Sequence, residues 1–111
     1  MKPGDVVLLP VPQIGGGPPK LRPALVLSLL PGAYQNVLIC GISTQLHHLE
    51  PDWDELVTLG DADFAASGLH RASAIRLSYL CAADSAAIAG SIGAVDPTRL
   101  RRLLDRLTPP A

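Results

Sequence analysis

Residues 22–45, RPALVLSLLPGAYQNVLICGISTQ, decide the fold of this chain. They contain two apolar segments, 24–28 and 36–42, whose length and content are typical of buried β-strands. Pro31 and Gly32 lie between the two segments and predict a turn. If the strands pair as an antiparallel hairpin, the start of the first lies beside the end of the second.

Further strand-like segments flank this hairpin on both sides. They lie at residues 6–9, 53–59, 73–80 and 86–95. Gly90 and Gly93 in the last segment indicate bulge or bend points. Because the strands do not alternate with helices, a parallel α/β sheet is excluded. We expect a mainly β (α+β) fold, a compact, strongly bent antiparallel barrel with a short helix and a C-terminal helix.

The two helices are expected late in the chain. Residues 61–68 resemble a short helix that Asp61 caps and that Gly68 ends in the left-handed conformation. For the last helix, Asp96 is the expected N-cap and Pro97 the first residue. Its apolar face follows from helical spacing of the leucines, which are Leu100, Leu103, Leu104 and Leu107.

Composition bounds the class of protein. The chain has 111 residues, of which 48% are hydrophobic, so we expect a single folded domain over residues 1–111. So large an apolar fraction leaves surface to bury against a partner and predicts a homodimer. The longest apolar stretch, 24–30, is too short to span a membrane. The N-terminal residues show no signal-peptide pattern, so we expect a cytoplasmic protein without membrane association.

The charges and the cysteines also bear on the class of protein. A net charge of −1 argues against a wholly basic nucleic-acid-binding surface, but it allows a local basic groove. Acidic residues concentrate in the segment 50–63, where we expect a solvent-exposed acidic face. Cys40 and Cys81 both lie in apolar contexts and are interpreted as reduced core thiols.

Common catalytic and metal-binding motifs are incomplete. Glycines 15–17 follow a strand, but two prolines stand where a phosphate-binding loop needs a helix, so a flexible loop is the better interpretation. His47 and His48 are adjacent and have no third ligand at a recognisable spacing, so no metal site is predicted. No GxSxG motif is present.

One constellation remains, and the predicted hairpin creates it. Arg22 lies at the start of one strand, and Ser43 and Thr44 lie at the end of the next, so these residues should meet at one edge of the barrel. A guanidinium beside hydroxyl groups is suited to bind phosphate. A structural contact between Arg22 and the backbone at a strand start explains the pattern equally well.

Taken in order, these segments resemble the PemK/MazF-like toxins of type II toxin–antitoxin pairs. The matching pieces are Gly4-Asp5-Val6, residues 22–28, residues 42–45, Gly68-Leu69, residues 73–76, Ile92-Gly93 and the final helix. The resemblance implies an SH3-like antiparallel barrel, a homodimer and a cognate antitoxin as partner. It also implies an endoribonuclease that cuts single-stranded RNA without a metal or other cofactor.

The resemblance also implies site residues. Arg22 matches the catalytic arginine of the family, and Ser43 stands where its catalytic threonine usually lies, with Thr44 beside it, so either hydroxyl can act. Arg76 matches a basic residue of some members, whose acid two residues later is Ser78 here. The loop before Arg22 carries no acid, so no role of a loop glutamate is transferred. The residues expected to contact RNA are Gln13, Lys20, Gln45 and Arg76.

In this interpretation the 2′-OH of the RNA attacks the adjacent phosphate, and Arg22 stabilises the phosphorane. His48 and His70 are candidates for proton transfer by their chemistry alone. The acidic segment 50–63 is expected to lie outside the groove or to restrict which RNA is cut. Two alternatives are a non-catalytic toxin of the gyrase-poison type, which binds a protein target, and a degenerate family member that only binds its partner.

Overall fold

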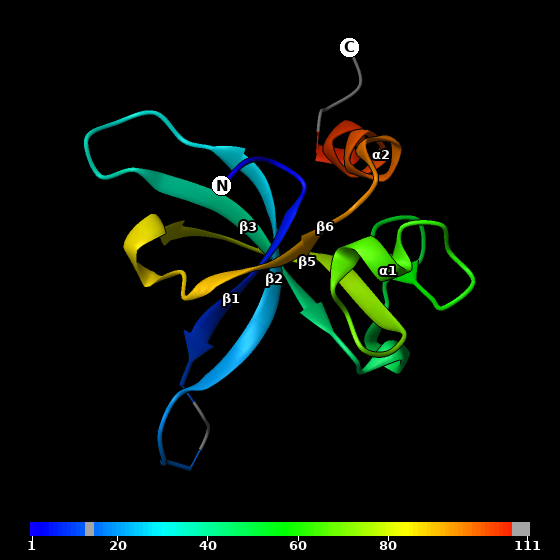
Figure 1. Ribbon diagram of the computed structural model, residues 1–111, viewed down its shortest axis with the longest axis horizontal. Helices are drawn as coiled ribbons and strands as arrows, with labels where there is room; N and C mark the ends of the chain where they lie inside the picture. The colour runs from blue at the N-terminus through cyan, green and yellow to red at the C-terminus, as the bar shows by residue number, and fades with distance from the viewer. Residues whose placement is uncertain (13–14, 108–111) are drawn as a thin grey trace.

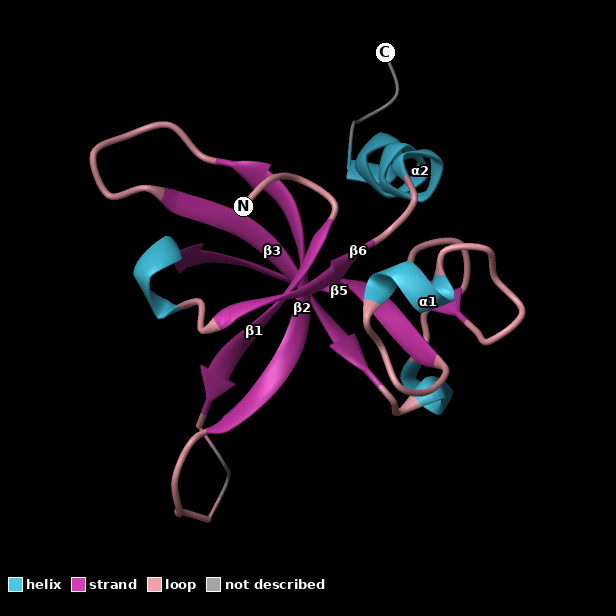
Figure 2. Cartoon of the chain, viewed as in Figure 1, coloured by secondary structure: helices cyan, strands magenta, loops and turns pink. Residues whose placement is uncertain are grey.

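A strongly curled antiparallel sheet makes up most of the molecule (Figures 1 and 2). The computed structural model describes residues 1–12 and 15–107, and within them six strands follow the order β4-β5-β3-β2-β1-β6. The strands are β1 (Asp5–Val11), β2 (Lys20–Leu29), β3 (Asn36–Ser43), β4 (Glu55–Val57), β5 (Ser73–Asp84) and β6 (Gly90–Ala94). The mainly β, antiparallel fold predicted from the sequence is confirmed.

The strands differ in length from the predicted segments for local reasons. Of the strand predicted at 53–59, only Glu55–Val57 (β4) forms a strand. The strand predicted at 86–95 begins at Gly90. It begins late because residues Ser85–Ala87 form a 3-10 turn, η2, whose N-cap Asp84 accepts a hydrogen bond from the backbone of Ala86 at 2.9 Å. The bend expected near Gly93 is confirmed, because the β1–β6 register shifts between Val6 and Val7.

The helical segments are η1 (Leu46–His48), α1 (Phe64–Ser67), η2 and α2 (Pro97–Leu107). Asp63, and not Asp61, stands at the start of α1, because the Asp61 carboxylate accepts a hydrogen bond from the backbone of Thr58 at 2.7 Å. Gly68 ends α1 with φ +76, as predicted. Asp96 caps α2 as predicted, and its carboxylate accepts a 2.7 Å hydrogen bond from the backbone of Thr98.

Both faces of the curled sheet are apolar. Val6, Leu25 and Cys40 belong to a larger cluster, and α2 covers it with the fully buried Leu103. Other side chains of the same strands form a smaller, separate cluster, namely Val7, Ala24, Val26, Val37 and Ile39. Cys40 is buried as predicted. The prediction of a second core thiol is wrong, because Cys81 is exposed on β5.

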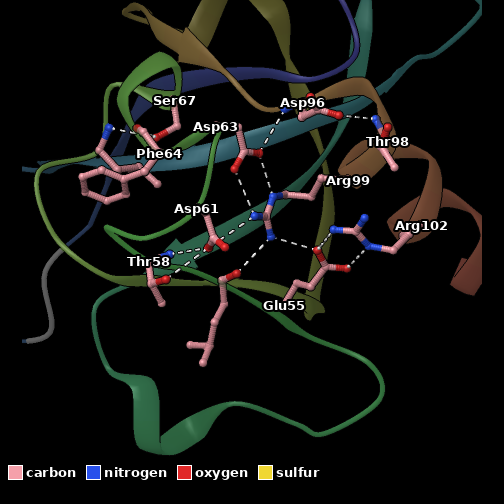
Figure 3. A network of polar contacts seen from close by, with 12 residues as sticks. Glu55, Thr58, Asp61, Asp63, Phe64, Ser67, Asp96, Thr98, Arg99 and Arg102 are labelled. Atoms are coloured by element: carbon pink, nitrogen blue, oxygen red, sulfur yellow. Dashed lines mark hydrogen bonds and ion pairs between the residues drawn. The ribbon is translucent and has the colours of Figure 1, made fainter.

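The acidic segment is not the solvent-exposed face that its composition predicts. Three of its carboxylates surround the guanidinium of Arg99, which α2 carries into the interior (Figure 3). Arg99 donates to Glu55 at 2.8 Å and to the carbonyl of Leu56 at 2.9 Å. Arg102 also binds Glu55, at 2.8 Å. These ion pairs fasten α2 to the segment around β4 and α1.

Candidate functional site

A cavity of about 560 Å³ opens beside the start of β2, the end of β3 and the middle of β5. Its polar lining consists of Arg22, Ser43, Thr44, Gln45, Ser73 and Arg76. Its apolar lining includes Leu9, Val11, Ile39, Ile42 and Tyr79. The cavity therefore combines two guanidinium groups and several hydroxyl groups with an apolar wall.

The hairpin of β2 and β3 brings Arg22 and Ser43 to the same cavity. Ala24 pairs with Gly41 in antiparallel register. Arg22 is two residues before Ala24 and Ser43 is two residues after Gly41, so both lie at the same end of the hairpin. Leu9 of β1 pairs with Arg22 and fixes the strand at this point. The proximity predicted from the two apolar segments follows from this register.

The guanidinium of Arg22 is available to a ligand. The residue is exposed, and within the described part of the chain no hydrogen bond or ion pair engages its side chain. A guanidinium carries five donors in a planar fork that matches the oxygens of a phosphate. Lys20, two residues earlier, is exposed at the start of β2 but is not a lining residue. The expected RNA contact at Gln13 lies outside the described residues.

The two candidate hydroxyls differ in their surroundings. Ser43 is half-buried, and its Oγ accepts a 3.0 Å hydrogen bond from the backbone of Gln45. Because that bond uses a lone pair, the hydroxyl proton of Ser43 stays available for donation. Thr44 is exposed at the rim of the cavity. Both hydroxyls can therefore donate to a phosphate oxygen, and Ser43 is the more firmly held.

Arg76 is tied to a buried carboxylate that the sequence did not indicate. Its Nε lies 3.5 Å from Oδ2 of Asp54, and its Nη2 donates to the hydroxyl of Ser78 at 3.3 Å. The side chain of Asp54 has no exposed area. It accepts hydrogen bonds from the backbones of Glu50 at 3.0 Å and Ser78 at 3.1 Å. No sequence signal separated Asp54 from the other acids of the segment 50–63.

The pKa of Asp54 lies below its usual value. Burial alone raises the pKa, but the hydrogen bonds from Glu50 and Ser78 and the charge of Arg76 lower it by more. The carboxylate is therefore ionised at neutral pH. No residue of the segment 50–63, all of which the structure describes, lines the cavity. The expectation that the acidic segment lies outside the groove agrees with this arrangement.

Tyr79 was also missed, because it depends on an irregularity in β5. Arg76 pairs with Gly41 and Leu80 pairs with Cys40, so residues 77–79 have no partner in β3. The ring of Tyr79 packs on Gly41, where an added Cβ would lie 3.2 Å from its Cδ1. Two-thirds of the residue, 66%, remains exposed. An aromatic ring thus packs on the sheet at Gly41 and lines the wall of the cavity.

The histidines do not join this site. His47 and His48 form η1 with their rings 4.1 Å apart, and they are exposed. Neither His48 nor His70 is among the lining residues of the cavity. Among the described residues, no group of three or more potential metal ligands is close enough to hold an ion. In the same part of the chain, no helix has the length and apolar character needed to cross a membrane.

Comparison with known protein families finds one that matches nearly the whole chain. The family described as "PemK-like, MazF-like toxin of type II toxin-antitoxin system" matches residues 2–109. The match covers every strand and helix described above. No curated protein matches the chain.

Proposed function

Because the chain belongs to the family of PemK-like, MazF-like toxins of type II toxin–antitoxin systems, we propose that it is a metal-independent endoribonuclease for single-stranded RNA. The observation that carries this proposal is the placement of Arg22, Ser43, Thr44 and Arg76 around one cavity. Cations and hydroxyl donors in that arrangement suit a phosphodiester that gains negative charge during reaction.

The proposed reaction uses the substrate's own nucleophile. The 2′-OH attacks the adjacent phosphorus and loses its proton, the P–O5′ bond breaks, and the leaving 5′ oxygen takes up a proton. The products are a 2′,3′-cyclic phosphate, which hydrolyses to a 3′-phosphate, and a 5′-hydroxyl. Arg22 offers parallel N–H donors to the dianionic phosphorane, and Ser43 or Thr44 donates to a further phosphate oxygen.

The remaining lining residues suit the neighbouring nucleotides. Single-stranded RNA is bound by aromatic faces that stack on unpaired bases and by cations along its backbone. Tyr79 offers such a face, and Gln45 offers an amide at the same rim. Arg76 supplies a second positive charge in the cavity, and Lys20 supplies one at the exposed start of β2. We assign them to RNA binding.

Partners follow from the same surface. The family implies an antitoxin, and an acidic, partly disordered segment of it would be attracted to Arg22, Arg76 and Lys20. Such a segment would cover the cavity and block access of RNA. We further propose a cytoplasmic homodimer. Exposed apolar side chains suit that role, among them Val11, Leu21, Leu46 and Leu80.

The test is cleavage of a long, defined single-stranded RNA in the presence of EDTA. Wild-type protein should cut it and leave cyclic or 3′-phosphate ends. Arg22→Ala should slow cleavage by about 10²–10³-fold, as loss of a transition-state donor does. Arg101→Ala is the matched control, because this arginine is exposed on α2, far along the chain from the cavity residues.

Two results would overturn the proposal. One is activity that disappears on chelation and returns with Mg²⁺. The other is a folded Arg22→Ala variant, judged by circular dichroism, that cleaves as fast as the wild type. Primer extension on the same RNA maps the cut positions and shows whether they cluster at one sequence.

A further inference from the structure

We infer that Asp54 is a positioning residue, which acts through Arg76 and Ser78 to hold a second guanidinium at the wall of the cavity. The inference rests on the proposed function and deepens it. Asp54 itself does not line the cavity, so it reaches the RNA only through Arg76. A role of this kind separates it from the residues that contact the phosphate.

The first argument is the burial of the carboxylate. An ionised carboxylate without exposed area is costly unless it is paired and hydrogen-bonded. Asp54 meets this requirement with bonds from the Glu50 backbone and from both the backbone and the hydroxyl of Ser78. Arg76 supplies the positive partner. The charge is therefore kept in the interior beside one arginine of the candidate site.

The second argument is the state of Arg76. Its Nε is buried without a hydrogen bond, and its contact with Asp54 at 3.5 Å is an ion pair only. One end of the guanidinium is thus fixed by Asp54 and by the hydroxyl of Ser78. A quarter of the side chain, 25%, is exposed, and the residue lines the cavity. The other N–H groups of the guanidinium remain for a ligand outside this pair, and an anionic phosphate suits them.

The third argument is the irregularity of β5. In an unbroken ladder the backbone N–H of Ser78 would face the neighbouring strand. Residues 77–79 have no partner in β3 and lie beyond the pairing with β4, and here the N–H of Ser78 donates to the carboxylate of Asp54. Tyr79, in the same unpaired segment, lines the cavity, and Arg76 lines it from the position just before that segment. The unpaired segment therefore builds the support of Arg76 together with the site.

The experiment is a double-mutant cycle on the full-length protein. The variants are Asp54→Asn, Arg76→Ala and the two combined, assayed for RNA cleavage with thermal melting as a check on folding. If Asp54 acts through Arg76, Asp54→Asn lowers the rate by about 10- to 100-fold in the wild-type background, the size expected for a misplaced group. It changes the rate by less than about twofold when Arg76 is already alanine.

Asp52→Asn is the matched control. Asp52 is exposed two residues away, and asparagine tolerates its φ of +63. That variant removes the same charge and should leave cleavage unchanged. If Asp54→Asn fails to fold, Ser78→Ala takes its place in the cycle, because it removes the hydroxyl link and keeps the carboxylate. Effects that simply multiply in the double variant would overturn the inference, because they indicate independent or merely structural roles.

A binding readout separates this inference from the proposed function. A single-stranded DNA of the same sequence lacks the 2′-OH and cannot be cleaved by the proposed reaction. Its Kd is measured by fluorescence anisotropy across the same variants. Binding with coupled effects of Asp54 and Arg76 supports the inference even where wild-type protein does not cleave RNA. Additive effects on Kd, or a wild-type protein that neither binds nor cleaves, overturn it.

Discussion

Arg99 of α2 donates two parallel hydrogen bonds to Asp63, from Nε to Oδ2 at 2.8 Å and from Nη2 to Oδ1 at 3.0 Å. Only 8% of either side chain is exposed. A bidentate pair of this kind has a fixed direction as well as a charge. It joins α2 to the turn before α1, and the hydrogen bonds of the sheet do not connect these two segments.

Arg99→Ala is expected to lower the free energy of unfolding by about 3–5 kcal/mol. The reason is that the buried Asp63 loses the cation that compensates its charge, whereas Glu55 keeps its ion pairs with Arg102 and Arg106. Urea denaturation at pH 7 measures the change. Arg101→Ala, on the exposed side of the same helix, should stay within about 0.5 kcal/mol of the wild type. Equal stability of the two variants would show that the buried network contributes nothing.

The stability should fall in acid through Asp63. The hydrogen bonds from Arg99 lower the pKa of this carboxyl, against an opposing effect of burial. A pKa that is lower in the folded than in the unfolded protein stabilises the fold above the unfolded value of about 3.9. That contribution is lost as pH falls through the folded value. Urea titrations from pH 6 downward should show a steeper loss for the wild type than for Asp63→Asn.

Tyr79 should matter for RNA affinity through its ring and not through its hydroxyl. Tyr79→Ala is expected to weaken binding by about 1–3 kcal/mol, the size of one base stacked on an aromatic face. Tyr79→Phe keeps the face and should bind like the wild type. Tyr34→Ala is the control, because Tyr34 is 83% exposed and does not line the cavity. Equal weakening by the substitutions of Tyr79 and Tyr34 would rule out a specific stacking site.

The two cysteines should differ in reactivity. Burial, with smaller effects of Asp54 and Cys81, raises the pKa of Cys40 to about 12. The Cys40 thiol is therefore un-ionised at neutral pH and shielded from reagents in solution. Cys81 is exposed and lines the cavity. Iodoacetamide should add one group to the native protein, at Cys81, and should inhibit RNA cleavage. Cys81→Ser should take up no label and stay active with the reagent present. Two labelled cysteines in native protein would contradict the placement of Cys40.

Part of this structure could be read from local sequence. The apolar segments around Pro31 and Gly32 predict the hairpin, and antiparallel pairing alone brings Arg22 toward Ser43. Asp96 and Pro97 mark the start of α2 for equally local reasons. These features depend on neighbours in the chain, so they need no knowledge of the tertiary structure.

Other features depend on contacts between distant residues and could not be predicted. Asp54 meets Ser78 across 24 residues of sequence, at a point where β5 leaves three residues unpaired with β3, and no pattern in the sequence marks that irregularity. The acidic segment looked exposed because its partners, Arg99 among them, lie on the last helix. Cys81 looked buried because its neighbours are apolar, although this part of β5 is exposed.

The pairing of β1 with β6 has a consequence for the order of events in folding. It joins Asp5 to Ala94, so the first strand gains this neighbour only when almost the entire chain is present. Contacts of such long range slow folding, because the chain entropy of closing the loop is lost before the contact forms. During synthesis, the core beneath α2 therefore stays open until Val95 and Leu103 have left the ribosome.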